Sequence, residues 1–358
     1  MKTINSQTGV KIKLPEPFCE NYDSTLDIRR YGQDNLYPQH LLQYVQTSEN
    51  FMSCSTRFAD FLKGQSLYSN DVLDIKDIHA VIRDYSIFNG FSIFVQYNGL
   101  GDVIKATHVP FETVRLGEKG ENGIYTYCYI CEDWSMKSTI NKKQISKKNI
   151  KRVWMFSESV ETRLRRMQES DYIGGEILYY SNTKSYPVER VRAALNYVSG
   201  DVGVSNILYR DIRTNFLQSS VLCIPRQSDE DYDEFTENLT SLQGDEHAFK
   251  ILTVEFSSKE DKPEVLNLNA EHYIDEVLKV SDKIRQAIVH CYNQEAFLRL
   301  EDGSLGFGSQ AISEIYRFYN KQIEPDRNAI IDTLRLVYPE FDIEPLVFEV
   351  EDKIIENS

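Results

Sequence analysis

The residues of this chain that could do chemistry are few and widely spaced. Cys128 and Cys131 form the only C-x-x-C pair, inside a run of aromatic and β-branched residues that predicts a strand. Side chains three apart on a strand point to opposite faces, so the two thiols should not converge on a metal ion. No second cysteine pair supplies the remaining ligands. We therefore expect two buried or half-buried strand cysteines, and we expect no cofactor.

Sequence patterns typical of catalysis are also missing. The histidines lie far apart, at positions 40, 79, 108, 247, 272 and 290, and form no H-E-x-x-H pattern. The sequence has no G-x-x-x-x-G-K-[ST], no G-x-S-x-G and no G-x-G-x-x-G after an expected strand, so neither nucleotide hydrolysis nor acyl transfer is indicated. We predict that the chain is not an enzyme.

The composition is that of a folded protein with more than one domain. The chain has 358 residues, of which 41% are hydrophobic and 27% charged, and its formal net charge is -15. Single hydrophobic cores stop growing at roughly 250–300 residues, so a second domain is expected. No segment reaches the ~18–20 apolar residues of a membrane span, and the first eight residues lack the apolar core of a signal peptide. We expect a cytosolic origin and no membrane partner.

Charge is distributed unevenly along the chain. Residues 141–166 hold nine basic side chains and two acidic ones, whereas 225–267 hold twelve acidic and four basic ones. Opposite charges favour contact between neighbouring copies of the chain, although either segment alone can be a solvated surface. The basic residues that would form this subunit interface are Lys142, Lys143, Lys147, Lys148, Lys151, Arg152, Arg163, Arg165 and Arg166.

The spacing of apolar residues predicts an α+β fold. Helical periodicity covers 36–63, ending at a cap on Gly64, and then 72–88. Short alternating segments with turn residues between them predict strands over 91–99, 103–108, 113–116, 123–131 and 150–156. The N-terminal half should therefore contain helices that lead into an antiparallel sheet.

Two longer helical segments flank the acidic segment. Apolar residues recur every three or four positions from Pro187 to Phe216, which predicts a helix on the order of 45 Å long. Gly200 and Gly203 should mark a kink or a close helix crossing within it. Between Ser220 and Phe256 the pattern is strand, helix and strand, which predicts a small α/β insert.

The second long helix is expected over 269–293, with a buried apolar side that includes Val280 and Ile284. A glycine-rich loop from 294 to 308 follows it. In the next helical stretch Phe318 and Tyr319 share one apolar face. Pro325 should kink or restart that helix, because proline removes one backbone donor.

Several segments of the chain resemble the portal proteins of tailed bacteriophages, specifically the small portal type. The order of these segments over most of the chain carries the resemblance. They are 34–38, 90–99 with Val109-Pro110 after it, 175–180 leading to Tyr186-Pro187, Asn215-Phe216 with 220–222, and 307–331 with its internal Pro325. The chain departs from the larger portals in ending at Ser358, so we expect no long C-terminal crown.

The resemblance implies a portal fold with an α/β wing, two stem helices and a clip inserted between them. Its parts would be the wing (1–186), the first stem helix (187–219), the clip (220–268), the second stem helix (269–293), the tunnel loop (294–308), and a C-terminal wing helix with a short tail (309–358). It also implies a homo-oligomeric ring, a dodecamer in that family, at one capsid vertex. DNA would be packaged and ejected through the ring.

The partners that the resemblance implies are the terminase large subunit, a head–tail adaptor, the major capsid protein and double-stranded DNA that passes without sequence recognition. The protein would reside in the virion and in the host cytoplasm during assembly. The clip residues that would dock the motor are Asp229, Glu230, Asp231, Asp233 and Glu234. The residues that would line the channel at the tunnel loop are Arg299, Glu301, Asp302, Gly303, Leu305, Gly306, Phe307 and Gly308.

Alternatives stay open at this point. The loop from 294 to 308 can instead be a surface connection, or a phosphate-binding loop that lacks the usual lysine. An acidic wall lets DNA slide, whereas a cationic one holds it through counterion release, so the net charge suits a conduit better than a sequence-specific binder. An acidic scaffolding or capsid-associated protein would form no open ring, and an uncharacterised hydrolase would need a metal or substrate pocket.

Overall fold

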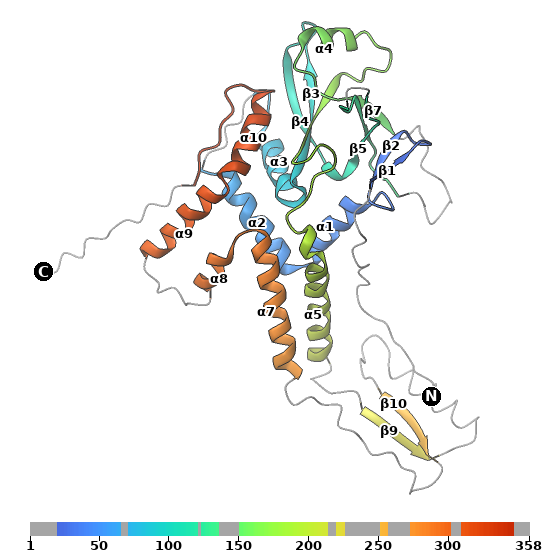
Figure 1. Ribbon diagram of the computed structural model, residues 1–358, viewed down its shortest axis with the longest axis vertical. Helices are drawn as coiled ribbons and strands as arrows, with labels where there is room; N and C mark the ends of the chain where they lie inside the picture. Colours follow the sequence, from blue (N-terminus) through green and yellow to red (C-terminus); the bar gives the residue numbers. More distant parts are fainter. Residues whose placement is uncertain are drawn as a thin grey trace, which may run out of the picture. The chain divides into compact units, whose positions relative to one another are not determined.

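The computed structural model describes residues 20–65, 71–120, 123–135, 150–213, 220–225, 251–256, 273–301 and 309–346. The chain combines helices with sheets that are antiparallel except for one parallel pair, which confirms the predicted α+β class (Figure 1). The chain divides into two compact units. The larger contains Pro15–Val198 and Gln286–Ser358, and the smaller contains Met1–Leu14 and Ser199–Arg285.

Three helices near the N-terminus form part of the core of the larger unit. They are α1 (Tyr37–Thr47), α2 (Glu49–Lys63) and α3 (Ile75–Phe88). Ser48 separates the first two, because its hydroxyl accepts a hydrogen bond from the Phe51 amide at 3.2 Å and so caps α2. Gly64 ends α2 at a φ of 67°, as the sequence predicted. Helix α3 begins three residues later than expected, at the Asp74 cap.

Two three-stranded antiparallel sheets follow in the larger unit. One has the order β4–β3–β8 and the other β5–β6–β7. The strands of the first are β3 (Gly90–Tyr97), β4 (Val103–Val109) and β8 (Gly175–Ser181); those of the second are β5 (Val114–Leu116), β6 (Tyr127–Ile130) and β7 (Lys151–Trp154). The sheets meet where the Phe156 amide donates to the Ile177 carbonyl at 2.8 Å. The antiparallel arrangement predicted for this half is confirmed.

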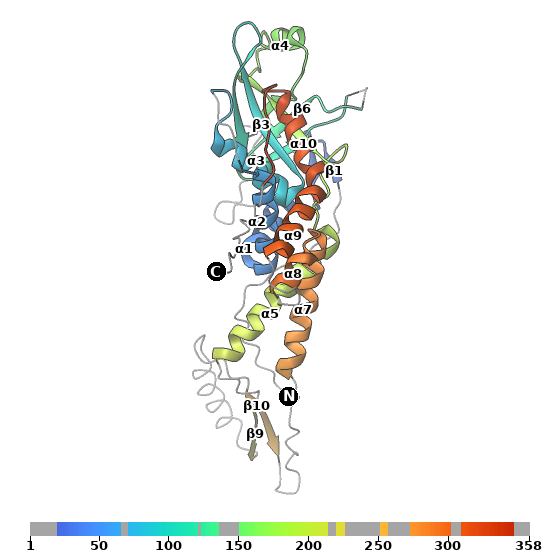
Figure 2. The same cartoon turned by 90° about the vertical axis from the view of Figure 1, so that its left-hand side faces the viewer.

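Three smaller elements complete this region. A two-stranded sheet of β1 (Glu20–Asp23) and β2 (Ile28–Tyr31) was not predicted, and helix α4 (Val160–Arg166) was not predicted either. Gly101, in the turn between β3 and β4, packs against α4, since a Cβ there would lie 3.0 Å from Cγ1 of Val160 (Figure 2).

The first long helix is α5 (Leu195–Arg213), preceded by a single 3₁₀ turn at Arg192–Ala194. Its 19 residues span roughly 28 Å. The predicted start at Pro187 is therefore wrong by eight residues, and the hydrogen bonds that cause this are described below. The predicted segment beyond 213 lies outside the described residues.

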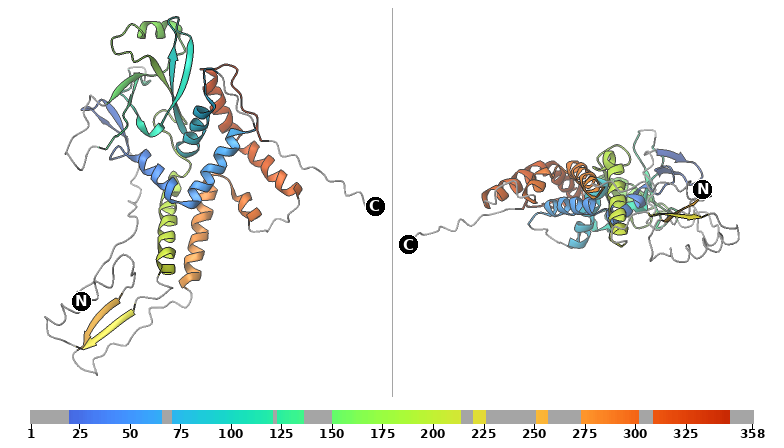
Figure 3. Two further views of the ribbon diagram at one scale, coloured as in Figure 1. Left: turned by 180° about the vertical axis from the view of Figure 1, so that it is seen from behind. Right: turned by 90° about the horizontal axis from the view of Figure 1, so that it is seen from below.

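The second long helix, α7 (Tyr273–Cys291), runs beside α5 (Figure 3). A Cβ on Gly200 would lie 3.1 Å from Cδ1 of Ile284, so the close helix crossing predicted at this glycine is present. A Cβ added to Gly203 would have no neighbour within 4 Å, so Gly203 does not contribute to the close crossing of α5 and α7. Val280 is 49% exposed, so the expectation of a buried apolar side is wrong for this turn of α7 in the single chain.

Two strands lie between α5 and α7 in the sequence. Strand β9 (Ser220–Pro225) pairs in parallel with β10 (Ile251–Phe256). Parallel strands need a crossover connection, which agrees with the predicted strand, helix and strand order. The predicted intervening helix lies outside the described residues.

The C-terminal helices are α8 (Glu295–Glu301), α9 (Ser309–Gln322) and α10 (Glu324–Arg335). Helix α8 occupies the first half of the segment that was predicted as a loop, and this part of the prediction is wrong. Pro325 stands in the first turn of α10, where its missing amide costs nothing, so it restarts the helix as predicted. Tyr319 is buried, whereas Phe318 is 65% exposed and does not share its face.

Helices from both ends of the chain pack together in the larger unit. The ring of Phe61 on α2 meets Tyr319 on α9 edge to face, with centroids 4.8 Å apart. Arg327 on α10 donates from Nη2 to the Phe61 carbonyl at 2.8 Å. Tyr85 on α3 donates to Oδ1 of Asp326 at 2.8 Å. Across the described ranges, no helix is both long and apolar enough to cross a membrane.

Candidate functional site

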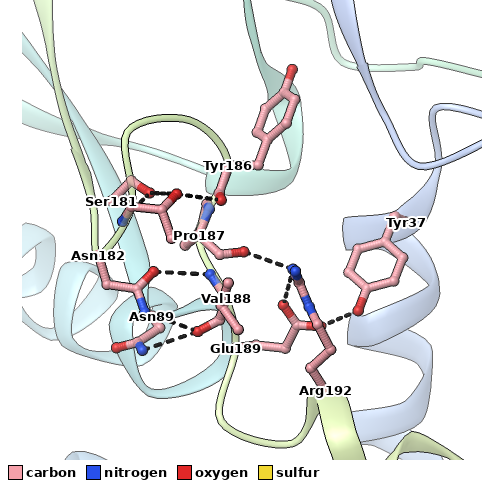
Figure 4. Close-up of polar contacts among 10 residues, drawn as sticks. Tyr37, Asn89, Ser181, Asn182, Tyr186, Pro187, Val188, Glu189 and Arg192 are labelled. Atoms are coloured by element: carbon pink, nitrogen blue, oxygen red, sulfur yellow. Dashed lines mark hydrogen bonds and ion pairs between the residues drawn. The ribbon is translucent and has the colours of Figure 1, made fainter. Parts of the chain in front are cut away.

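The connector, which we define as residues 182–194, links β8 to α5 and is held by side chains (Figure 4). The Val188 carbonyl accepts hydrogen bonds from Nδ2 of Asn89 and Nδ2 of Asn182, each at 3.1 Å. The Val188 amide donates to Oδ1 of Asn182 at 2.9 Å. The Pro187 carbonyl accepts from Nη2 of Arg192 at 2.8 Å. These bonds occupy the first carbonyls that a helix would need, which explains why α5 does not begin at Pro187.

A buried carboxylate lies at the centre of the connector. Glu189 has a fully buried side chain and forms an ion pair with Arg192, with Oε2 at 2.7 Å from Nη2. The Tyr37 hydroxyl, on α1, donates a short hydrogen bond to Oε1 of Glu189 (Figure 4). Burial, followed by the negative charge of Glu189, raises the pKa of the Tyr37 phenol. Burial alone would lower the pKa of Arg192, but the bonds to Glu189 outweigh it and the pKa is raised.

Arg190 attaches the connector to the C-terminal helices. Its Nη2 forms a short ion pair with Asp326 at the start of α10. The guanidinium lies over the ring of Phe58 on α2, 4.5 Å from the centroid. Together with Tyr37 on α1 and Asn89 at the end of α3, this ties the connector to four helices of the larger unit.

A second junction lies where α7 ends. Asn293 breaks the helix with a left-handed φ of 53°. Gln294 follows it and is fully buried. Its Nε2 donates to the Cys54 carbonyl at 3.0 Å and to the Tyr319 hydroxyl at 2.9 Å. Just before it, the Tyr292 hydroxyl donates to the Ser86 carbonyl at 2.9 Å. The end of α7 is therefore bonded to α2, α3 and α9.

Both junctions were missed in the sequence, because their bonds join distant positions. Gln294 and Cys54 are 240 residues apart, and Asn89 and Val188 are 99 apart. Asn89 precedes Gly90, and this pair was not recognised as a helix cap. In the structure Asn89 ends α3 with a left-handed φ of 61°.

One histidine and carboxylate pair lies in the sheet region. Nε2 of His108 is 2.6 Å from Oδ2 of Asp84. The same carboxylate oxygen accepts from the Phe111 amide at 3.1 Å, and Asp77 accepts from the His108 amide at 2.9 Å. These bonds join α3 to β4, and we assign the pair a structural role. Among the described residues, no cluster of three or more His, Cys, Asp or Glu side chains could hold a metal ion.

The two cysteines of the C-x-x-C pair do not converge. Cys128 belongs to a core cluster with Val153 and Ile177, whereas Cys131 belongs to another with Trp134. Both are buried, and burial raises the pKa of each thiol. The prediction of buried strand cysteines is confirmed for Cys128; Cys131 directly follows β6 and is buried as well.

The proposed basic interface patch is divided by the fold. Arg163 is buried, and its Nε donates to the Ser157 carbonyl at 2.6 Å. Arg166 pairs with the fully buried carboxylate of Glu176 at 2.6 Å. These two guanidinium groups bond within the chain and are not available to a neighbouring subunit. The prediction that Arg163 and Arg166 belong to the interface patch is therefore wrong.

The other members of the basic patch differ in position. Lys151 and Arg165 are exposed. Arg152 is exposed as well but is bonded to Asp171. The remaining four, Lys142, Lys143, Lys147 and Lys148, lie outside the described residues. An interface role for the exposed members stays a prediction.

The predicted channel and clip residues are mostly outside the described part of the chain. Arg299 and Glu301 lie in helix α8. Phe297, also in α8, is buried and meets the ring of Phe61 with centroids 5.8 Å apart. The other channel candidates, Asp302, Gly303, Leu305, Gly306, Phe307 and Gly308, and the clip candidates, Asp229, Glu230, Asp231, Asp233 and Glu234, lie outside it.

Comparison with known proteins gives matches among solved structures alone. No protein-family model matches the sequence, and no curated protein matches it. A chain of the neck of a native gene transfer agent particle, computed with C12 symmetry, is 11% identical, with 88% of this chain and 86% of that chain covered and a TM-score of 0.45. A chain of the virion of that particle is 10% identical, with 87% and 84% covered and a TM-score of 0.44.

An HK97 family phage portal protein from Corynebacterium diphtheriae also matches. It is 13% identical, with 86% of this chain and 94% of that chain covered and a TM-score of 0.35. The solved structures that match thus include a phage portal protein, the family that the sequence resembles.

Proposed function

We propose that the chain is a phage portal protein, one subunit of a ring at a capsid vertex through which DNA is packaged and ejected. The observation that carries the proposal is the pair of long helices α5 and α7. The first begins in the larger unit and the second ends in it, and they approach closely at Gly200 and Ile284. Between them in the sequence stands the insert with the parallel strands β9 and β10. A stem with a clip at its end requires this order of elements.

The buried polar contacts at the connector and at Gln294 support the assignment of α5 and α7 as stem helices. The connector fixes the start of α5 through a buried ion pair, and Gln294 fixes the end of α7 through a buried amide. Buried polar groups favour the geometry that keeps their hydrogen-bond partners, because an unpaired buried polar group is costly. On this proposal α5 and α7 are the stem helices, residues 220–268 are the clip, and the part of the chain with the two sheets is the wing.

Exposed apolar side chains on the two long helices support assembly into a ring. Tyr209 on α5 is 59% exposed, and Leu278 and Val280 on α7 are each 49% exposed. Large apolar side chains that stay exposed are typical of surfaces that other protein covers. Neighbouring copies of the chain are the partner that a ring supplies.

The first part of the proposed tunnel loop is helical. Helix α8 (Glu295–Glu301) is anchored by the buried ring of Phe297, and residues 302–308 lie outside the described part of the chain. The terminase motor and the adaptor would dock on the acidic clip, and the major capsid protein would hold the wing.

Electron microscopy of the purified protein tests the proposal. Rings with a central opening are expected at low salt, and fewer at high salt, because exposed charges more than ~8 Å apart are screened at physiological ionic strength. Native mass spectrometry gives the subunit number independently. If both methods find monomers alone at low salt and high protein concentration, the chain is not a portal. A closed particle without an opening would favour a scaffolding or capsid-associated protein.

A further inference from the structure

The connector has a helical sequence but is not helical. Pro187 suits the first position of a helix, and Glu189 would then stand in the first turn, where the helix dipole favours a carboxylate. Ala193 and Ala194 are strong helix formers. The three-four apolar spacing of α5 continues backward through Leu195, Val191 and Val188. The local sequence therefore favours a helix that begins eight residues before α5 does.

Side chains hold the connector away from the helical conformation. In an α-helix the Pro187 carbonyl would accept from the Val191 amide, and the Val188 carbonyl from the Arg192 amide. Here the first carbonyl is bonded to the Arg192 guanidinium, and the second to the amides of Asn89 and Asn182. Side chains that bond the backbone compete with the helical ladder in this way.

The hydrogen bonds that would be exchanged between the two conformations are comparable in strength. Each hydrogen bond from a side chain to a backbone carbonyl contributes about 0.5–1.5 kcal/mol, and a helical backbone bond contributes a similar amount. The ion pair of Glu189 and Arg192 spans three residues, a spacing at which side chains also meet on a helix. It can therefore persist in both conformations. The bonds that select the non-helical one are those that Asn89 and Asn182 make to Val188.

We propose that the connector is a helix–coil switch, in which residues 187–194 join α5 as about two further turns once the two asparagines release Val188. Residues 192–194 already form a 3₁₀ turn, so the switch converts this turn to α-helix and extends the helix back over 187–191. The proposal goes beyond the portal assignment and does not depend on it.

A double variant tests the switch in the full chain. Asn89→Gly removes one amide and tolerates the left-handed φ of 61° at that position. Asn182→Ala removes the other. In protein labelled with ¹³C-valine, the Cα resonances of Val188 and Val191 should move toward helical values. Hydrogen exchange at the Val191 and Arg192 amides should slow at the same time, since a helix would protect both.

The matched control is Asn98→Ala in the turn between β3 and β4. Oδ1 of Asn98 accepts from the amides of Leu100 and Asp102, each at 2.9 Å, so this variant also removes hydrogen bonds between an asparagine side chain and the backbone, but far from the connector in the sequence. This variant should leave the connector resonances unchanged. Adding Ala193→Gly to the double variant should shift them back, because glycine costs ~1 kcal/mol in a helix interior.

Resonances that stay in place, or that move to unstructured values with faster exchange, overturn the proposal. The single variants Asn89→Gly and Asn182→Ala each keep one amide on the Val188 carbonyl and serve if the double variant does not fold. Each should give a smaller change in the helical direction. If neither single variant shows that change while the rest of its spectrum is native, the proposal is overturned.

Discussion

Gln294 donates a hydrogen bond from Nε2 to the hydroxyl oxygen of Tyr319 at 2.9 Å. The same Tyr319 hydroxyl donates to the Tyr292 carbonyl at 3.2 Å, so the phenol connects the two residues on either side of Asn293. The relationship fixes the backbone at the end of α7 against α9. It also gives the fully buried amide of Gln294 its partners.

Gln294→Ala should destabilise the chain by about 1–3 kcal/mol, because the Cys54 carbonyl loses a buried donor. Urea unfolding followed by tryptophan fluorescence measures the change. Gln322, exposed at the end of α9, is the matched control, and Gln322→Ala should change the stability by less than about 0.5 kcal/mol. Equal effects of the two substitutions would contradict the role of the buried amide.

Glu189→Ala should cost about 3–5 kcal/mol, because it leaves the Arg192 guanidinium without its carboxylate in a buried site. Tyr37→Phe should cost about 1.5–3 kcal/mol, the range for a hydrogen bond to a charged group. In the double variant the loss of stability should be smaller than the sum of the two single losses, because both substitutions remove the same hydrogen bond, the one between Tyr37 and Glu189. Denaturant titration of the two single variants and the double variant measures this coupling, and strict additivity would show that the two groups do not interact.

Gly203→Ala should stabilise the chain by up to about 1 kcal/mol, because alanine is the better helix former and an added Cβ meets nothing within 4 Å. Gly200→Ala should gain less, since its Cβ would lie 3.1 Å from Ile284, which has to move. Thermal unfolding of both variants beside the unchanged chain checks the difference. A larger gain at Gly200 than at Gly203 would contradict the close crossing of α5 and α7.

Glu112→Gln should stabilise the chain at pH 7. Burial, with the negative charge of Asp84 adding to it, raises the pKa of Glu112 above its usual value of 4.5. A raised carboxyl pKa contributes stability that is complete below pH 4.5 and is lost as the pH rises through the folded-state value. Urea unfolding at several pH values should therefore show a gain at neutral pH that disappears in acid. Glu132→Gln, at an exposed position, should show no such gain.

Reversing the clip cluster Asp229, Glu230, Asp231, Asp233 and Glu234 to lysine should abolish DNA packaging and leave ring assembly intact, because the motor loses its electrostatic target. Packaging by particles that carry the variant measures this. The matched control reverses five exposed glutamates elsewhere, Glu132, Glu158, Glu161, Glu169 and Glu314. Normal packaging by particles with these charge reversals would contradict the proposed motor-docking role of the acidic cluster. Ring formation is tested separately by electron microscopy.

Elements with local signals were predictable from the sequence. The end of α2 at Gly64 and the restart of α10 at Pro325 depend on backbone properties of single residues. Five of the six strands in the two sheets followed from alternation and turn residues, whereas β8 (Gly175–Ser181) was not predicted. The Gly200 crossing followed from the cost of glycine inside a helix, which a close neighbour such as Ile284 offsets.

Features that depend on distant partners were not predictable. The start of α5 is decided by Asn89 and Asn182, and neither carries a signal for a helix boundary thirteen or more residues later. Arg163 and Arg166 were placed in a surface patch because a sequence shows charge but not burial. Helix α8 was read as loop, since the glycines after it dominate the composition and the ring contacts of Phe297 are not local.

The hydrogen bond between Arg327 and the Phe61 carbonyl has a consequence for synthesis of the chain, because the two residues are 266 positions apart. Ribosomes add about 5–20 residues per second, so α2 is complete for about 13–50 s before α10 exists. Throughout that interval the face of α2 that carries Phe61 lacks its packing partners on α9 and α10. The contacts of Phe61 with α9 and α10 can therefore form only when synthesis of the chain is nearly complete.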